Sequence, residues 1–240
     1  MWESQLGFLL LNLCFEGEGL KFIMSIKSKI FRELEVFCKE YFSTRDYFAL
    51  VYGSFASDDF REDSDLDLFV AVKDRKADDF EKLRDFFIDL NARNNLKINE
   101  EVPYKNKLIV TYKDAADAID LKAFIKSGAK YIIPPVTAGM EFLASKEVRF
   151  RIILNALTSP NQYICGNKGE YVLLKKEAEV AIMRLACNLT EKSDPNPDEI
   201  LGVLLEGKNG EKSGDYLGYR NHRPRVMKYL KELISRNKIH

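Results

Sequence analysis

Two apolar runs, separated by a short polar segment, place the strongest constraint on how this chain can fold. Residues 47–52 (YFALVY) are apolar, aromatic and β-branched, and Gly53 follows them directly. This pattern predicts a buried strand that enters a tight turn. Residues 65–72 alternate acidic and apolar side chains before becoming fully apolar, which predicts a second strand. The chain must therefore build a sheet that contains both runs.

The residues around these two runs predict the rest of an α/β unit. Apolar residues recur with the helical period over residues 25–42 and 77–94, so we expect two helices that bury one face each. Residues 96–102 and 108–112 predict two further strands, and residues 115–124 predict a short helix. A sheet covered by helices follows from this order.

The second half of the chain has a different character. Pro134 and Pro135 interrupt the sequence, and helical patterns dominate after them. The predicted helices cover residues 140–157, 170–189, 198–205 and 225–234, with loops at residues 159–168, 193–197 and 207–218. The expected fold class is α/β (α+β), with a small mixed β-sheet domain and flanking helices at residues 24–134, followed by an α-helical domain at residues 135–240.

Residues 1–23 are expected to lie outside this fold, because Met24 begins a more ordinary amino-terminal sequence. The apolar stretch at residues 6–15 is too short to span a bilayer, and it lacks the basic region and cleavage site of a signal peptide. The four cysteines lack the spacing of a zinc site, which suits a reducing compartment. These features predict a cytoplasmic protein with no membrane partner.

The chemistry is predicted by Asp65 and Asp67, which lie two residues apart in the second strand. Because side chains alternate along a strand, both carboxylates should project from the same face. Two neighbouring anions repel each other unless they share a cation, and Mg²⁺ prefers such oxygen ligands together with substrate phosphates. The pair therefore predicts a metal-bound nucleotide.

Gly53 and Ser54 supply a second feature of a nucleotide site. They follow the first strand and are expected to open a short helix, where backbone N–H groups and the Ser54 hydroxyl can hold phosphate oxygens. Neither GxxxxGK[ST] nor GxGxxG occurs in the chain, so the two commonest nucleotide-binding folds are excluded.

A strand, Gly-Ser, ten residues and Asp-x-Asp together resemble the nucleotidyltransferase superfamily typified by DNA polymerase β, especially its small bacterial and antibiotic-modifying members. The resemblance covers residues 45–112. It implies that Asp65 and Asp67 bind two Mg²⁺ ions and that Gly53 and Ser54 hold the β- and γ-phosphates of ATP or another NTP.

The family also implies a third carboxylate on a neighbouring strand. Strand phase places it on the face shared by Lys97 and Asn99, which selects Glu101, with Glu100 as the second choice. A strict aspartate at this position is absent.

Other positions near the Gly-Ser pair agree less well with the pattern of the family. Many small relatives carry Arg-Gly shortly after Gly-Ser, where this chain has Ser57 and Asp58, so a positive charge that faces the phosphates is missing there. Arg61 stands where another common arginine lies, and Arg61 and Ser64 are candidate nucleotide-binding residues.

The last 21 residues, 220–240, contain seven basic residues and one acidic residue. A basic helix here could hold nucleotide phosphates, RNA or an acidic partner, or it could be a solvated face whose apolar stripe packs on the domain. The loop at residues 207–219 could be a mobile lid or a plain connector.

These features predict an enzyme that transfers a nucleoside monophosphate from ATP or another NTP to an acceptor hydroxyl and releases pyrophosphate. The acceptor could be a small molecule such as an aminoglycoside or lincosamide, a protein side chain, or an RNA end. A formal net charge of zero disfavours RNA. The alternative is an inactive protein of this fold that binds nucleotide as a regulatory or antitoxin-like partner.

Overall fold

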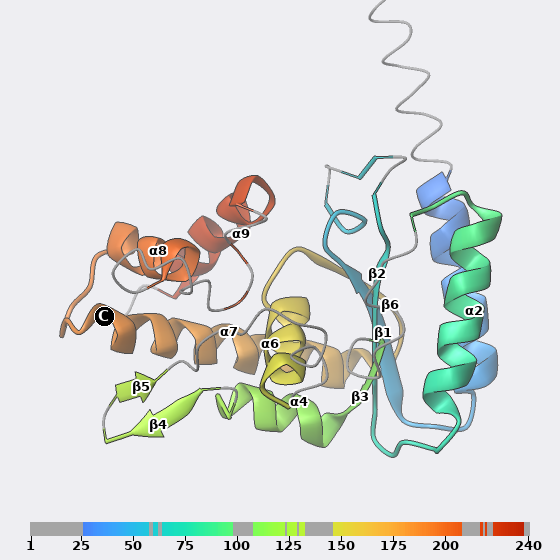
Figure 1. The fold of residues 1–240 in the computed structure, drawn as a ribbon, viewed down its shortest axis with the longest axis horizontal. Coiled ribbons are helices and arrows are strands. Elements are labelled where there is room, and N and C mark those ends of the chain that lie inside the picture. Colours follow the sequence, from blue (N-terminus) through green and yellow to red (C-terminus); the bar gives the residue numbers. More distant parts are fainter. Residues whose placement is uncertain are drawn as a thin grey trace, which may run out of the picture.

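The computed structural model describes residues 26–57, 60–61, 64–97, 108–122, 124–128, 130–132, 146–207, 217, 219 and 223–237. A four-stranded sheet lies in the middle of the molecule, with strand order β3-β2-β1-β6 (Figure 1). The strands are β1 (Tyr47–Tyr52), β2 (Asp67–Val72), β3 (Ile109–Thr111) and β6 (Asn161–Gly166). Strand β1 is antiparallel to β2 and β6, whereas β3 is parallel to β2, so the sheet is mixed as expected.

Helices cover both faces of this sheet (Figure 1). They are a helix over residues 26–41, α2 (Asp79–Arg93), α4 (Tyr112–Ile119), α6 (Lys146–Leu157), α7 (Lys168–Thr190), α8 (Pro197–Glu206) and α9 (Arg223–Arg236). The first two lie on one side, and the others lie on the opposite side with a small hairpin of β4 (Ile125–Ser127) and β5 (Lys130–Ile132). The fold is the expected combination of an α/β sheet unit and a helical region.

Each face of the sheet belongs to its own apolar core, because side chains alternate along β1 and β2. The N-terminal core joins the helix over residues 26–41 and α2 to one set of strand residues: Tyr47, Ala49, Val51, Leu68, Val70 and Val72. The C-terminal core joins α4, α6, α7, α8 and α9 to the other set: Phe48, Leu50, Tyr52, Phe69 and Ala71.

One buried ion pair connects the elements around the N-terminal core. The Arg45 guanidinium donates to both carboxylate oxygens of Asp79, at 2.6 and 2.7 Å, and Asp79 is fully buried. The Tyr41 hydroxyl and the Lys76 backbone N–H also donate to this carboxylate. Burial alone would raise the pKa of Asp79, but these hydrogen bonds and the Arg45 charge outweigh it and lower the pKa.

Strand β6 corrects the predicted loop at residues 159–168. Ile164 and Cys165 are buried in the N-terminal core, and β6 pairs with β1 along its length. Gly166 has φ of +99°, and a Cβ atom there would lie 2.2 Å from the Tyr47 carbonyl oxygen. Glycine is therefore required where β6 leaves the sheet.

The region after β3 also differs from the expectation of a helix at residues 115–124. Helix α4 begins at Tyr112, because Thr111 and Asp114 form a capping box in which each side chain accepts from the other residue's backbone N–H. It ends at Ile119, and the β4-β5 hairpin follows.

Several predicted features lie outside the described residues. These include the extension at residues 1–23, the break at Pro134 and most of the strand at residues 96–102. The division into two domains therefore stays a prediction, and the sheet takes β6 from the second of them. Within the described part of the chain, no helix is both long and apolar enough to cross a membrane.

Candidate active site

Asp65 and Asp67 occur where β2 begins. Asp67 alternates with Phe69 and Ala71, which belong to the C-terminal core, whereas Leu66 lies in the N-terminal core. The two carboxylates therefore share the phase of the face that packs on α6, α7 and α9. Strand pairing sets their neighbours, since Tyr52 is opposite Asp67 and Lys97 forms a parallel bridge with Asp65.

The glycine turn, residues 53–57, lies directly against this carboxylate face. Gly53 has φ of +72°, and a Cβ atom there would lie 2.4 Å from Oδ2 of Asp67. A Cβ there would force the Asp67 carboxylate to move, and the positive φ itself favours glycine, so glycine suits a turn this close to Asp67. The turn and the carboxylate form one compact site.

Ser54 holds the glycine turn to the second strand. Its side chain is buried, and its hydroxyl donates to the Asp65 carbonyl oxygen at 3.3 Å. The Ser57 backbone N–H donates to the Ser54 carbonyl at 3.2 Å, which closes a turn. Residues 53–57 therefore form a turn in place of the expected start of a short helix.

Lys27 is a component of the site that the sequence did not indicate. It comes from the helix over residues 26–41 and donates to the Ser57 carbonyl at 3.0 Å. Its ammonium group also lies 5.5 Å from the ring centroid of Phe55 and 5.7 Å from that of Phe60. Lys27 thus stabilises the end of the glycine turn through a charged hydrogen bond and two cation-π contacts.

Arg61 and Ser64 form a second turn just before Asp65. The Arg61 backbone N–H donates to the Ser64 hydroxyl at 2.9 Å, and the Ser64 N–H donates to the Arg61 carbonyl at 3.0 Å. Arg61 itself is exposed. In this structure the Ser64 hydroxyl serves the turn, and the Arg61 side chain lies on the surface.

Helix α9 brings Arg225 to the site from the other end of the chain. A guanidinium nitrogen of Arg225 lies 3.5 Å from the position of a Cβ on Gly53, the same point that Asp67 approaches. The sequence marks the basic stretch at residues 220–240, but no local pattern distinguishes this residue within it. Apolar residues of the same helix, including Val226 and Leu230, are buried in the C-terminal core.

Asp65 and Asp67 supply part of the ligand set that a hard divalent cation needs. Two carboxylates on one strand face are suitable Mg²⁺ ligands, and the absence of a Cβ at Gly53 lets the glycine turn approach one of them closely. Among the residues that the structure describes, no group of three or more acidic, His or Cys side chains is placed to hold a metal.

Glu101 and Glu100, the two candidates for the third carboxylate, lie outside the described residues. At the start of the predicted strand 96–102, Leu96 is buried in the N-terminal core and Lys97 is exposed, which is the expected alternation. The choice between the two glutamates stays a prediction.

Comparison with known families agrees with this geometry. Residues 37–132 match the family model described as polymerase beta, nucleotidyltransferase. This part of the chain therefore resembles a nucleotidyltransferase domain. No curated protein and no solved structure matches the chain. The nucleotidyltransferase match includes the glycine turn and both aspartates, and it ends before α6, so Arg225 lies outside it.

A cavity of about 620 Å³ is lined by residues of β6, α7 and α9. We call it the α7–α9 cavity. Asn161 lines it and pairs with Tyr52, the residue before Gly53. Tyr52 of β1 pairs with Asn161 of β6 on one side and with Asp67 of β2 on the other, so two strand spacings, about 10 Å, separate Asn161 from Asp67.

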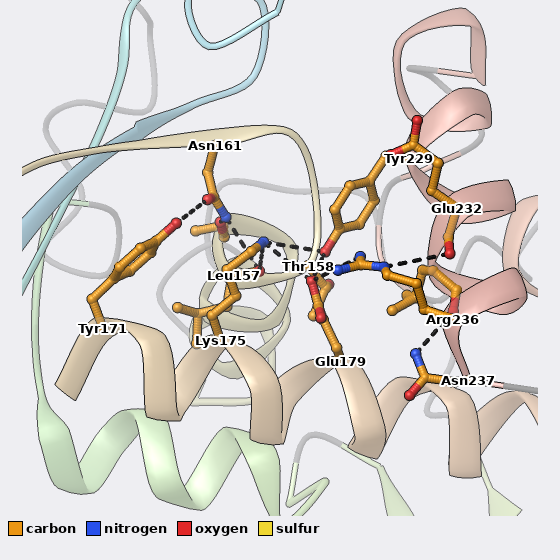
Figure 2. Close-up of polar contacts among 12 residues, drawn as sticks. Leu157, Thr158, Asn161, Tyr171, Lys175, Glu179, Tyr229, Glu232, Arg236 and Asn237 are labelled. Atoms are coloured by element: carbon orange, nitrogen blue, oxygen red, sulfur yellow. Dashed lines mark hydrogen bonds and ion pairs between the residues drawn. The ribbon is translucent and has the colours of Figure 1, made fainter. Parts of the chain in front are cut away.

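A polar network lines the wall of this cavity (Figure 2). The Lys175 ammonium donates to the Leu157 carbonyl at 3.0 Å and to the Tyr229 hydroxyl at 3.2 Å. The Tyr229 hydroxyl donates to Glu179 at 2.5 Å, and Arg236 forms an ion pair with Glu179 at 3.7 Å. Burial lowers the pKa of Lys175, although Glu179 opposes this shift.

Proposed function

We propose that this protein is a Mg²⁺-dependent nucleotidyltransferase that transfers a nucleoside monophosphate, AMP from ATP in the first instance, to a hydroxyl group of an acceptor. The observation that carries this proposal is the contact between the Gly53 turn and Asp67, on the face that Asp65 shares. The cysteine pattern supports the cytoplasm as the proposed compartment.

The proposed roles follow from the positions of the residues. Asp65 and Asp67 would hold Mg²⁺, which neutralises the triphosphate and stabilises the attacking and leaving oxygens when it is bound. The glycine turn would receive the β- and γ-phosphates, and Ser54 fixes that turn relative to Asp65. Gly53 lets that turn lie close to Asp67.

The proposed reaction is a single in-line displacement. A bond forms between the acceptor oxygen and the α-phosphorus, and the bond from that phosphorus to the bridging oxygen of the β-phosphate breaks. Pyrophosphate leaves, and the acceptor proton passes to Glu101 as general base. Glu101→Gln should therefore slow the chemical step more than Glu100→Gln at saturating NTP.

We propose a small molecule as the acceptor and the α7–α9 cavity as its binding site. The volume of this cavity is within the range of small-molecule sites. Among the described residues of its lining are three basic side chains, Lys175, Lys231 and Arg236, and one acidic side chain, Glu232, while Glu179 contacts Lys175 and Arg236 from behind. This charge balance favours a neutral or anionic hydroxyl compound over a polycation such as an aminoglycoside.

Labelled ATP tests the proposed reaction directly. The protein is incubated with Mg²⁺ and a panel of neutral, anionic and cationic hydroxyl compounds, with ³²P in either the α or the γ position. We expect the α label in an acceptor and the γ label in pyrophosphate, with Asp67→Asn as the inactive control. Transfer of the γ label would identify a kinase instead. Nucleotide binding without movement of either label would favour the non-catalytic alternative.

A further inference from the structure

We propose that Arg225 of α9 binds the triphosphate of the NTP held at the glycine turn, and so supplies the positive charge that the turn itself lacks. This inference rests on the proposed function, since it assigns a residue to the same nucleotide. Arg225 lies outside the segment that matches the nucleotidyltransferase family.

The position of Arg225 is the first argument. Its guanidinium nitrogen and the Asp67 carboxylate converge on the point that a Cβ of Gly53 would occupy. A phosphate group that enters beside Gly53 therefore meets this guanidinium. Arginine suits that role, because its planar group presents several N–H donors that match phosphate oxygens in pairs.

The charges of the glycine turn are the second argument. Residues 53–57 are Gly, Ser, Phe, Ala and Ser, so the turn contributes no cation of its own. Lys27 comes from the other side of the sheet, and its ammonium group donates to the Ser57 carbonyl and lies over two aromatic rings. Arg61 is exposed on the surface. Arg225 is thus the described cation that approaches Gly53 itself.

The anchoring of α9 is the third argument. Tyr229 lies one helical turn after Arg225, on the same side of α9, and it donates to Glu179 of α7. Arg236, further along α9, forms an ion pair with the same glutamate (Figure 2). Buried apolar residues complete the contact between α9 and the C-terminal core. Arg225 is therefore half-buried on a helix whose position is fixed.

The neighbour Arg223 provides a matched control. It lies on the same helix two residues earlier, it is exposed, and it pairs with Glu206 of α8. Removing it takes one positive charge from α9 but none from the vicinity of Gly53. A loss that depends only on the net charge of α9 would appear in both variants.

The test compares nucleotide binding by Arg225→Ala, Arg225→Lys and Arg223→Ala in the full chain. Calorimetry with Mg²⁺ measures the dissociation constants of an NTP that has a methylene bridge between its α- and β-phosphates, and of the corresponding NMP. We expect Arg225→Ala to weaken NTP binding about 10- to 100-fold, the range for a lost charged hydrogen bond, and to change NMP binding far less. Arg225→Lys should retain part of the affinity, and Arg223→Ala should bind like the wild type.

Two results would overturn this assignment. Unchanged NTP affinity in Arg225→Ala would show that the guanidinium makes no contact with the triphosphate, and equal losses for NTP and NMP would show that Arg225 only supports the structure. A wild-type protein that binds no NTP would instead overturn the proposed function. Melting temperatures without ligand identify any variant that is misfolded, and Arg225→Lys then decides the question.

Discussion

The face of the sheet that packs on the helix over residues 26–41 and α2 is closed by apolar side chains, whereas the opposite face also carries Asp67, and β6 at the edge of the sheet contributes to a cavity with charged residues in its wall. Both faces contain ionisable groups, but these groups have different surroundings. On the first side, the Asp79 carboxylate receives four hydrogen bonds and is fully buried. On the second side, Lys175 and Arg236 line a cavity of about 620 Å³.

This difference separates structural charges from functional ones. A buried carboxylate whose oxygens are all occupied stabilises the fold and has no capacity left for a ligand. Charges at the wall of a cavity keep one side open to a molecule that enters it. We therefore assign stability to the Arg45–Asp79 pair, and we propose catalysis and binding for the face that carries Asp65 and Asp67.

The largest effect should come from the carboxylates of the site. Asp67→Asn and Asp65→Asn should each lower nucleotide transfer by about 100-fold or more, because they remove a charged ligand that positions the metal. The free energy of unfolding should change little, since neither carboxylate is fully buried. Transfer assays and urea unfolding of the same samples check both statements. Near wild-type turnover in the two variants would refute the metal assignment.

On the side of the sheet that packs on α2, we expect substitutions to lower stability and to leave activity unchanged. Asp79→Asn or Arg45→Ala should lower the free energy of unfolding by about 3–5 kcal/mol, because each leaves an uncompensated group where the partner was. Transfer per folded molecule should stay at the wild-type level. Urea unfolding measures the loss, and turnover is corrected for the folded fraction. A loss of turnover in the fully folded variant would contradict the assignment of this pair to stability alone.

The same pair predicts how stability responds to acid. The pKa of Asp79 is lowered from its ordinary value of 3.8 in the folded state, so the folded state binds this proton less readily than the unfolded state does. Its contribution is present above that ordinary value and is lost as the pH falls through the lower folded pKa.

Other carboxylates titrate in the same range, so the prediction concerns a difference between two proteins. Hydrogen bonds from Lys122 and Lys113 lower the pKa of Asp117 to about 2, and that contribution is common to both proteins. Unfolding free energies at several pH values below 5 should fall less steeply in Asp79→Asn than in the wild type. Parallel curves would contradict this prediction.

The smallest effect concerns Ser54. Ser54→Ala should weaken NTP binding by about 0.5–1.5 kcal/mol, the net contribution of an ordinary hydrogen bond, whether its hydroxyl meets a phosphate or only holds the turn to Asp65. Calorimetry with a non-hydrolysable NTP measures this change. An unchanged affinity would remove Ser54 from the nucleotide site.

The N-terminal side of the molecule was predictable from the sequence for a physical reason. The apolar runs of β1 and β2 and the helical periods of residues 26–41 and α2 are local patterns, and each matches the face that the element buries. Gly53, Asp65 and Asp67 likewise lie within a single connection between the neighbouring strands β1 and β2, so their proximity follows from a short stretch of sequence.

The features that were missed depend on contacts between distant parts of the chain. Strand β6 has a polar start and is flanked by Pro160 and Asn167, so it resembles a loop until β1 provides its hydrogen-bond partner. Lys27 and Arg225 approach the glycine turn from opposite ends of the chain. No local pattern marks one lysine or arginine among 37 basic residues as part of a site.

The most direct test of this account is whether the face that carries Asp67 binds a nucleotide through a metal. Calorimetry measures the affinity for an NTP with a methylene bridge between its α- and β-phosphates, first with Mg²⁺, then with a chelator, and then with Mg²⁺ and the Asp67→Asn variant. No acceptor is needed in any of the three titrations. The account predicts binding in the first titration and a loss of at least about tenfold in the other two. Equal affinity in all three would contradict it.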